Sequence, residues 1–332
     1  TNAGHVRVYE YSNGTWTQLG SDIDGEAALD QSGVDVSLSG DGTILAIGAA
    51  YNDGNGSYSG HARVYEYSNS SWTQVGSDID GEAVDDWSGI SVSLSDDGTI
   101  VAVGAPQNDG NGTYSGHARV YEYSNSSWTQ LGSDIDGEAA GDHSGWSVSL
   151  SDDGDVVAIG AIYNGTAVGH VRVYEYSNSS WTQVGSDIDG EATGDQSGKA
   201  VSLSGDGTIV AIGAPNNDAW GWVNGINANV GHVRVYTTTL CVASPDTSVS
   251  ASGTLGFCDG SSVVLTAAAG QSYLWSTGAT SQSITTSQSG SYYAVVTTSD
   301  GCSDTTATYT TTLFASPDTS VSASGTLGFC DG

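Results

Sequence analysis

The sequence predicts an all-β protein built of repeated four-stranded units. Among 332 residues there are 47 Gly but only 4 Pro, and Val, Ile, Thr, Tyr and Trp recur between clusters of Gly, Ser, Asn and Asp. This composition is typical of strands joined by tight turns. A segment reading Gly-His-x-Arg-Val-Tyr begins at Gly4, Gly60, Gly116, Gly169 and Gly231. We therefore expect a repeat of about 56 residues and almost no helix.

Each repeat contains four strand-like stretches. In one copy, apolar and polar residues alternate from Val92, an Asp97-Gly98 turn follows, and an apolar run extends from Ile100 to Ala105, a pattern typical of a β-hairpin. The later segments "GHARVYEYSN" and "SWTQ" supply the outer two strands. Four strands in a repeat of this length are what one blade of a β-propeller requires. Because a blade cannot bury both faces alone, we expect neighbouring blades to stack.

The repeats end near Tyr236, where the composition changes to Ser, Thr and Ala with few acidic residues. Residues 243–260 recur identically as residues 315–332, which marks a second repeat of 72 residues. We expect a propeller repeat region at 1–240, a second domain at 241–314 and the start of its next copy at 315–332. The first region holds four repeats plus an extra strand. It is therefore either part of a larger ring or a four-bladed ring with one strand displaced.

Each repeat has a Ser-Gly pair, then a "VSLS" strand, a segment like "DGTIVAIGAP" and a strand like "GHxRVYEY". This order resembles the FG-GAP repeats of integrin α-subunit propellers and their bacterial secreted relatives. This resemblance covers residues 1 to about 236 and implies four-stranded blades. The next segment, in which Trp275 lies between Cys258 and Cys302, resembles immunoglobulin-like modules of large surface and gliding-associated proteins of Bacteroidota. That resemblance implies a β-sandwich with a Cys258–Cys302 disulfide, and hence an oxidising exterior. Cys241 has no counterpart in the next copy, and its partner stays open.

The charge balance is strongly acidic, with 38 Asp and Glu against 6 Lys and Arg. The resulting negative potential disfavours nucleic acid and anionic membranes as partners and favours divalent cations. No stretch approaches the roughly 20 apolar residues that a membrane helix needs, so membrane insertion is not expected.

Alternating carboxylates in the "DIDGEAALD" segment, which begins at Asp22 and has an equivalent in each later repeat, form the sharpest candidate site. They occupy positions 1, 3, 5 and 9 of the segment, which is the spacing in the calcium loops of FG-GAP blades. Unlike those loops, this segment has its Gly at position 4 and follows the "WTQ" strand. Two interpretations remain open, a Ca²⁺ site and a solvated acidic turn. The candidate ligands are Asp22, Asp24, Glu26, Asp30, Asp78, Asp80, Glu82, Asp86, Asp134, Asp136, Glu138, Asp142, Asp187, Asp189, Glu191 and Asp195.

Two further sets of residues stand out. The repeated His before each "RVY" is expected to pack and to form turn hydrogen bonds, and the repeated Arg to pair with blade carboxylates. An insertion in the last repeat carries Trp220 and Trp222. This aromatic pair is a candidate for contact with a ligand or with the adjoining domain, and the alternative is a buried cap.

The recurrence of nearly every ionisable residue argues against catalysis, which needs a unique cluster of groups. We expect a non-enzymatic structural or adhesive module of a large extracellular bacterial surface protein or appendage. Its partners would be other copies of itself, neighbouring domains of a long array, or surface glycans and proteins of another cell. The alternative is a calcium-dependent receptor for carbohydrate or protein, and a glycan-degrading enzyme is less favoured. Ca²⁺ is the one cofactor suggested.

Overall fold

The computed structural model describes residues 2–218, 230–238, 245–298 and 303–315. The chain divides into two compact units, Thr1–Thr238 and Thr239–Gly332. Both consist of β-strands in their described residues, which confirms the all-β class. The short segment α1 (Asn164–Ala167) contains positive φ angles at Gly165 and Thr166, so it is a turn rather than a regular helix. Within the described residues, no helix has the length and apolar character needed to cross a membrane.

Three complete sheets form the centre of the first unit. Each is an antiparallel meander of four strands in chain order, and a fifth strand of two residues pairs with the start of the third. The first of these sheets contains β5 (Val36–Leu38), β6 (Ile44–Ala49), β7 (His61–Ser68), β8 (Ser71–Gln74) and β9 (Ile79–Asp80). The next contains β10 (Ser91–Leu94), β11 (Ile100–Ala105), β12 (His117–Ser124), β13 (Ser127–Gln130) and β14 (Ile135–Asp136). The third contains β15 (Ser144–Leu150), β16 (Val156–Ala161), β17 (His170–Ser177), β18 (Ser180–Gln183) and β19 (Ile188–Asp189).

Partial sheets lie before and after these three. The first has β1 (His5–Val6) paired with β4 (Ile23–Asp24), and β2 (Tyr9–Ser12) paired with β3 (Thr15–Gln18). The last has β20 (Ala200–Leu203), β21 (Ile209–Ala214) and β22 (His232–Thr237). Strands of the first and last sheets do not pair with each other in the described part of the chain. The predicted strand order is therefore found, and no sheet closes a ring.

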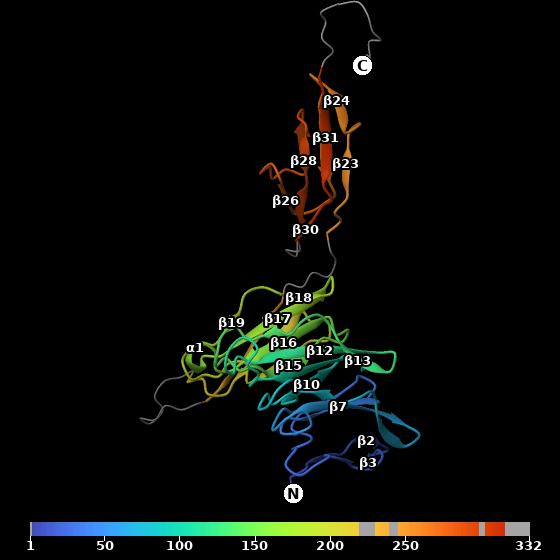
Figure 1. Cartoon of the computed structure of the whole chain (residues 1–332), viewed down its shortest axis with the longest axis vertical. Coiled ribbons are helices and arrows are strands. Elements are labelled where there is room, and N and C mark those ends of the chain that lie inside the picture. Colours follow the sequence, from blue (N-terminus) through green and yellow to red (C-terminus); the bar gives the residue numbers. More distant parts are fainter. Residues whose placement is uncertain (1, 219–229, 239–244, 299–302, 316–332) are drawn as a thin grey trace, which may run out of the picture. The chain divides into compact units, whose positions relative to one another are not determined.

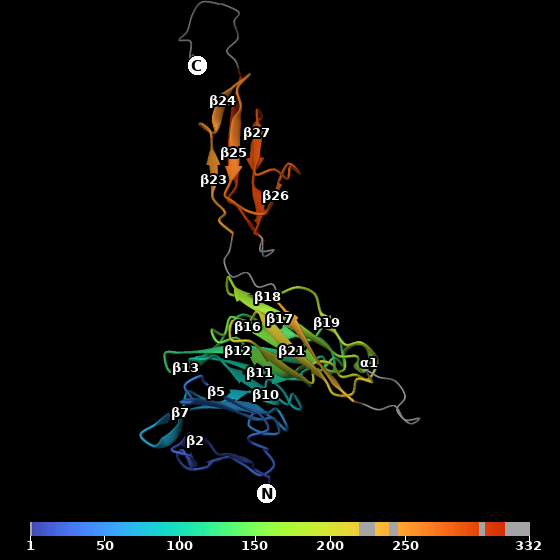
Figure 2. The ribbon, with the colours of Figure 1, turned by 180° about the vertical axis from the view of Figure 1, so that it is seen from behind.

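The sheets follow one another in chain order, from the blue first sheet to the yellow last sheet (Figures 1 and 2). Alternate residues of one strand pack on opposite neighbours, as the period of two in a strand requires. In β11, Val101 and Val103 join the core shared with the preceding sheet, whereas Ala102 joins the core shared with the following sheet. Burial of both faces explains why this strand is a continuous apolar run.

Glycine in the second strand allows the sheets to approach closely. A Cβ on Gly104 would lie 2.0 Å from the backbone oxygen of Gly145 in the next sheet. Gly48 and Gly160 face the following sheet in the same way. Serine hydroxyls then link the first strands of successive sheets, because Ser93 Oγ accepts a hydrogen bond of 2.9 Å from the backbone N–H of Leu150.

The second unit contains three small sheets. Their strands are β23 (Val249–Ala251), β25 (Val263–Ala267) and β27 (Ser283–Thr286); β26 (Ser272–Trp275), β29 (Ala294–Thr297) and β30 (Ser303–Thr305); and β24 (Gly256–Cys258), β31 (Tyr309–Phe314) and β28 (Gly290–Tyr292). Side chains such as Leu265, Trp275 and Val296 share one core. Trp275 is 1% exposed, and its Nε1 donates to the carbonyl oxygen of Ser281 at 2.8 Å.

The predicted disulfide stays a prediction. Cys258 ends β24, but Cys302 lies outside the described residues, as do Cys241, Trp220 and Trp222.

Candidate functional site

The four acidic positions of each repeat have different surroundings. Asp78 Oδ1 accepts a hydrogen bond of 2.6 Å from Gln74 Nε2, whereas Asp80 contributes its backbone oxygen to Arg119 of the next sheet. Among the described residues, three groups of His and carboxylate atoms lie within 4.8 Å of one another, and each combines two repeats. No such group holds all four acidic positions of one repeat. Calcium binding therefore stays a prediction.

The last acidic position is a buried structural group. Asp86 is 3% exposed, and its Oδ2 accepts hydrogen bonds from the backbone N–H groups of Glu82 at 3.1 Å and Ala83 at 2.9 Å, and from Asn108 Nδ2 at 3.1 Å. The same Asp–Asn bond recurs 22 residues apart in the other repeats. Sequence reasoning missed this partner, although an Asn shortly after each second strand was a visible signal.

A buried histidine begins the third strand of each complete sheet and faces two carboxylates. His117 Nδ1 lies 3.9 Å from Glu82 Oε2 and 3.9 Å from Asp134 Oδ2. Here Glu82 belongs to the preceding repeat and Asp134 to the same repeat as the histidine. The other two members of this set are Glu26, His61 and Asp78, and Glu138, His170 and Asp187. We call the three sets the inter-sheet clusters.

The histidine rings of the inter-sheet clusters are buried and neutral. His61 and His117 are 1% and 0% exposed, and neither ring nitrogen of either residue has a hydrogen-bond partner. Burial, with the nearby Arg119, lowers the pKa of His117 to about 4 despite the opposing effect of Asp134. The predicted packing role is therefore seen, but the predicted turn hydrogen bond is absent at His61 and His117. Their Nδ1 atoms lie 3.7–3.9 Å from the facing carboxylate oxygens, which is beyond hydrogen-bond distance.

The repeated arginines pair with blade carboxylates, which confirms that prediction: Arg7 pairs with Asp22 of its own repeat, and the four later arginines pair with glutamates of the preceding repeat. Arg119 Nη1 lies 3.5 Å from Glu82 Oε1, its Nη2 donates to the carbonyl oxygen of Asp80 at 2.7 Å, and its guanidinium lies over the ring of Tyr121. The equivalent ion pairs are Arg63–Glu26, Arg172–Glu138 and Arg234–Glu191.

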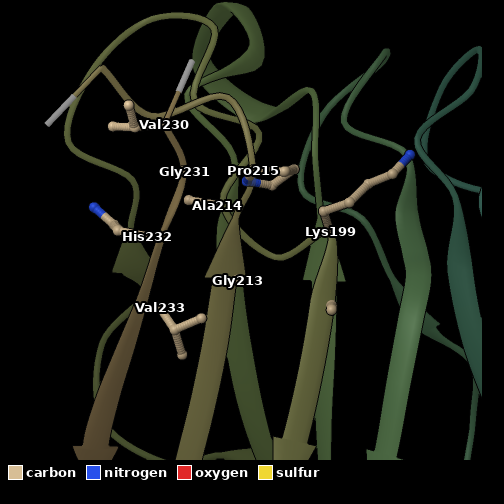
Figure 3. Close-up of a pocket in the computed structure, with 9 residues that line it drawn as sticks. Lys199, Gly213, Ala214, Pro215, Val230, Gly231, His232 and Val233 are labelled. Carbon is tan, nitrogen blue, oxygen red and sulfur yellow. The ribbon is translucent and has the colours of Figure 1, made fainter. Parts of the chain in front are cut away.

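A hollow of about 490 Å³ lies on the outward face of the last sheet (Figure 3). Its lining includes Gly213, Pro215 and His232, and Lys199 points away from His232. Gly104 occupies the position of Gly213 in an earlier sheet, and a Cβ added there would meet the backbone of the next sheet. A Cβ added to Gly213 would meet only Ala200 of its own sheet, at 3.6 Å. This hollow is therefore the position that a following sheet takes elsewhere in the array.

A second hollow, of about 530 Å³, holds a row of aromatic rings from the loops of consecutive sheets. The ring centroid of Tyr51 lies 5.5 Å from that of Tyr58 and 5.2 Å from that of Trp87. Tyr58 and Tyr114 are 39% and 45% exposed. We call Tyr51, Tyr58, Trp87 and Tyr114 the aromatic groove. Sequence reasoning missed it, although Trp87 stands where other repeats have Gln31, His143 or Gln196.

No family model and no curated protein matches the chain. Two solved structures that resemble it are TolB from Acinetobacter baumannii and a proposed 6-phosphogluconolactonase from Bacteroides uniformis. TolB is 14% identical with a TM-score of 0.36, and the match covers 93% of this chain and 64% of TolB. The second is 9% identical with a TM-score of 0.37, and the match covers 89% and 90%. At such TM-scores neither likeness carries a functional argument.

Proposed function

We propose that the chain is a structural and adhesive module of a large extracellular bacterial surface protein, in which FG-GAP-like propeller blades precede an immunoglobulin-like domain. The observation that carries this proposal is the recurrence of one inter-sheet ion pair at four successive boundaries, from Arg63–Glu26 to Arg234–Glu191. Charged groups that an enzyme would gather at one place are here distributed along an array, where each holds one sheet to the next.

The ionisable residues that do not recur also support a non-enzymatic function. The ring of His143 lies between those of Tyr114, at 5.7 Å, and Tyr163, at 4.9 Å. Lys199 Nζ lies 3.8 Å from the ring centroid of Trp146. Both side chains are thus engaged in aromatic packing. With a net charge of −32, the surface suits a salt-containing exterior, where other copies or another cell would be the partners.

Adhesion by an array depends on its number of repeats, because weak contacts add through multivalency. Removal of residues 57–112 deletes one repeat and places Thr113 after Gly56, where Ser57 now stands. The test displays both forms on a non-adherent bacterium and counts the cells retained on polysaccharide-coated glass under flow. We expect the full chain to retain more cells than the shortened one. If cells that display either form were retained in the same number as cells that display the anchor alone, the adhesive function would be overturned.

The aromatic groove favours a second candidate function, carbohydrate recognition. Exposed rings such as Tyr58 and Tyr114 offer flat apolar faces to sugar rings, and Asp85 and Gln107 in the same lining offer polar contacts. A glycan array probed with the chain, with Ca²⁺ and with a chelator, tests this function. We expect saturable binding that Trp87→Ala abolishes and that the control Trp16→Ala, outside the groove, leaves unchanged. Equal binding by the two variants would exclude the groove.

A further inference from the structure

We propose that the three inter-sheet clusters bind divalent transition-metal ions such as Zn²⁺, one ion in each cluster. Each cluster offers one imidazole nitrogen and two carboxylate oxygens within 4.8 Å. This donor set differs from an all-oxygen calcium loop, because imidazole favours Zn²⁺, Ni²⁺ or Cu²⁺ over Ca²⁺. The proposal does not rest on the adhesive function.

The geometry is close to that of a bound ion. Zinc bonds to nitrogen and oxygen of about 2.0–2.2 Å place neighbouring ligand atoms roughly 3.3 Å apart. His117 Nδ1 lies 3.9 Å from each of the two facing carboxylate oxygens, and all three donor atoms lie within 4.8 Å of one another. A contraction of roughly 0.6 Å toward the ring and of at most about 1.5 Å between the carboxylates therefore closes the site. The carboxylates have the freedom for this movement, because Glu82 and Asp134 are 46% and 33% exposed while His117 is fixed in the core.

The buried imidazole supplies an independent sign of a ligand. A buried nitrogen without a hydrogen-bond partner is costly, and both nitrogens of His61 and of His117 are in this state. Their Nδ1 atoms face the carboxylates at 3.7 and 3.9 Å. A metal ion accepts the lone pair of neutral Nδ1, and the burial that lowers the pKa of His117 keeps it neutral at pH 7.

Surrounding groups already orient both carboxylates, as outer-shell partners do in metal sites. Gln130 Nε2 donates a hydrogen bond of 2.7 Å to Asp134 Oδ1, which leaves Oδ2 to face His117. Arg119 lies at Oε1 of Glu82, which leaves Oε2 to face the same ring. Because the guanidinium offsets one carboxylate charge, we expect moderate affinity.

The two ends of the array provide internal controls. His5 is exposed, and Asp22 is bound by Nε and Nη2 of Arg7. His232 lies 3.6 Å from Glu191, but Val249 occupies the sequence position that corresponds to Asp187. Among the residues that the structure describes, neither end has the complete donor set, so the proposal predicts three ions per chain and not five.

Titration of the tag-free 332-residue chain with ZnCl₂ in a calorimeter, followed by metal analysis after dialysis, tests the proposal. We expect three ions per chain and a higher thermal unfolding midpoint, since an ion bound only by the native state stabilises it. Co²⁺ is a second probe, because its visible spectrum reports imidazole ligation. His117→Gln should lower the stoichiometry to two, and the control His232→Gln should leave three.

Glu82→Gln is a second variant that removes one ligand but keeps the buried histidine. It tests the same cluster if the His117→Gln variant fails to fold. It should also bind two ions. Because it loses the ion pair with Arg119, its stoichiometry and not its unfolding midpoint is compared with that of the parent. No uptake of Zn²⁺, or three ions retained in both variants, would overturn the proposal. Uptake with no Co²⁺ spectral sign of nitrogen ligation would likewise contradict it, because it would place the ions on surface carboxylates.

Discussion

The indole Nε1 of Trp128 donates a hydrogen bond of 2.9 Å to the carbonyl oxygen of Val75, 53 residues earlier in the chain. Trp72 and Trp181 make the same bond to the preceding sheet, at 2.9 and 2.8 Å. Trp16, at the same position of the first sheet, is 69% exposed. One repeated side chain therefore joins each complete sheet to the one before it.

Trp128→Phe removes this bond and leaves the Val75 carbonyl without its donor. We expect the free energy of unfolding to fall by about 1–3 kcal/mol, measured by urea denaturation followed by circular dichroism. The matched control Trp16→Phe should change it by less than about 0.5 kcal/mol. Equal effects of the two variants would show that the inter-sheet bond contributes nothing.

Gly104→Ala should destabilise the chain far more than Gly213→Ala. The added methyl at 104 would overlap the backbone oxygen of Gly145, whereas the methyl at 213 would lie in ordinary contact. Because backbone cannot move aside as a side chain can, we expect a loss of about 3 kcal/mol or more for Gly104→Ala. Thermal unfolding of the two variants checks this difference, and a tolerated Gly104→Ala would mean that the sheets are further apart than described.

Asp86→Asn should destabilise the chain even when calcium is chelated. The substitution replaces a charged oxygen that accepts three hydrogen bonds by a neutral amide oxygen, which accepts them more weakly, at a cost of about 1–3 kcal/mol. The neighbouring Asp85 is exposed, so Asp85→Asn serves as the control and should be neutral. If Asp86→Asn lowered the unfolding midpoint only in the presence of Ca²⁺, the residue would instead be a calcium ligand.

Burial raises the pKa of Tyr121 to about 12, although Arg119 acts in the opposite direction. In the unfolded chain a tyrosine ionises near pH 10. The stabilising effect is therefore fully present below about pH 10 and is lost as the pH rises toward 12, by up to roughly 3 kcal/mol. Relative to the parent, Tyr121→Phe should gain stability over this interval, and Tyr11→Phe, at an exposed position, should not. Urea midpoints measured from pH 9 to 12 decide between these outcomes.

Local patterns of the sequence predicted the strands well. The alternation at Val92, the Asp97-Gly98 turn and the apolar run to Ala105 correspond to β10 and β11, because period and turn chemistry are properties of adjacent residues. The inter-sheet clusters were not predictable in this way. Glu82 meets His117 only because the closeness of sheets, set at residues such as Gly104, brings a loop of one repeat onto the next.

The acidic segment shows the same limit. Its carboxylates share a regular spacing, yet Asp86 turns inward to Asn108 while Asp78 faces a histidine. Spacing along the chain does not determine the direction in which either side chain points, because that direction depends on contacts that are made only when the sheets stack.

Each complete sheet packs on the sheets before and after it, and its serine, tryptophan and arginine contacts all cross the same two boundaries. A pulling load applied along the chain would therefore peel the array one sheet at a time. Each step would release about 56 residues, or roughly 190 Å of extended chain. The array would then act as an extensible tether. A force–extension curve of the chain would show regularly spaced force peaks, one for the rupture of each boundary between sheets.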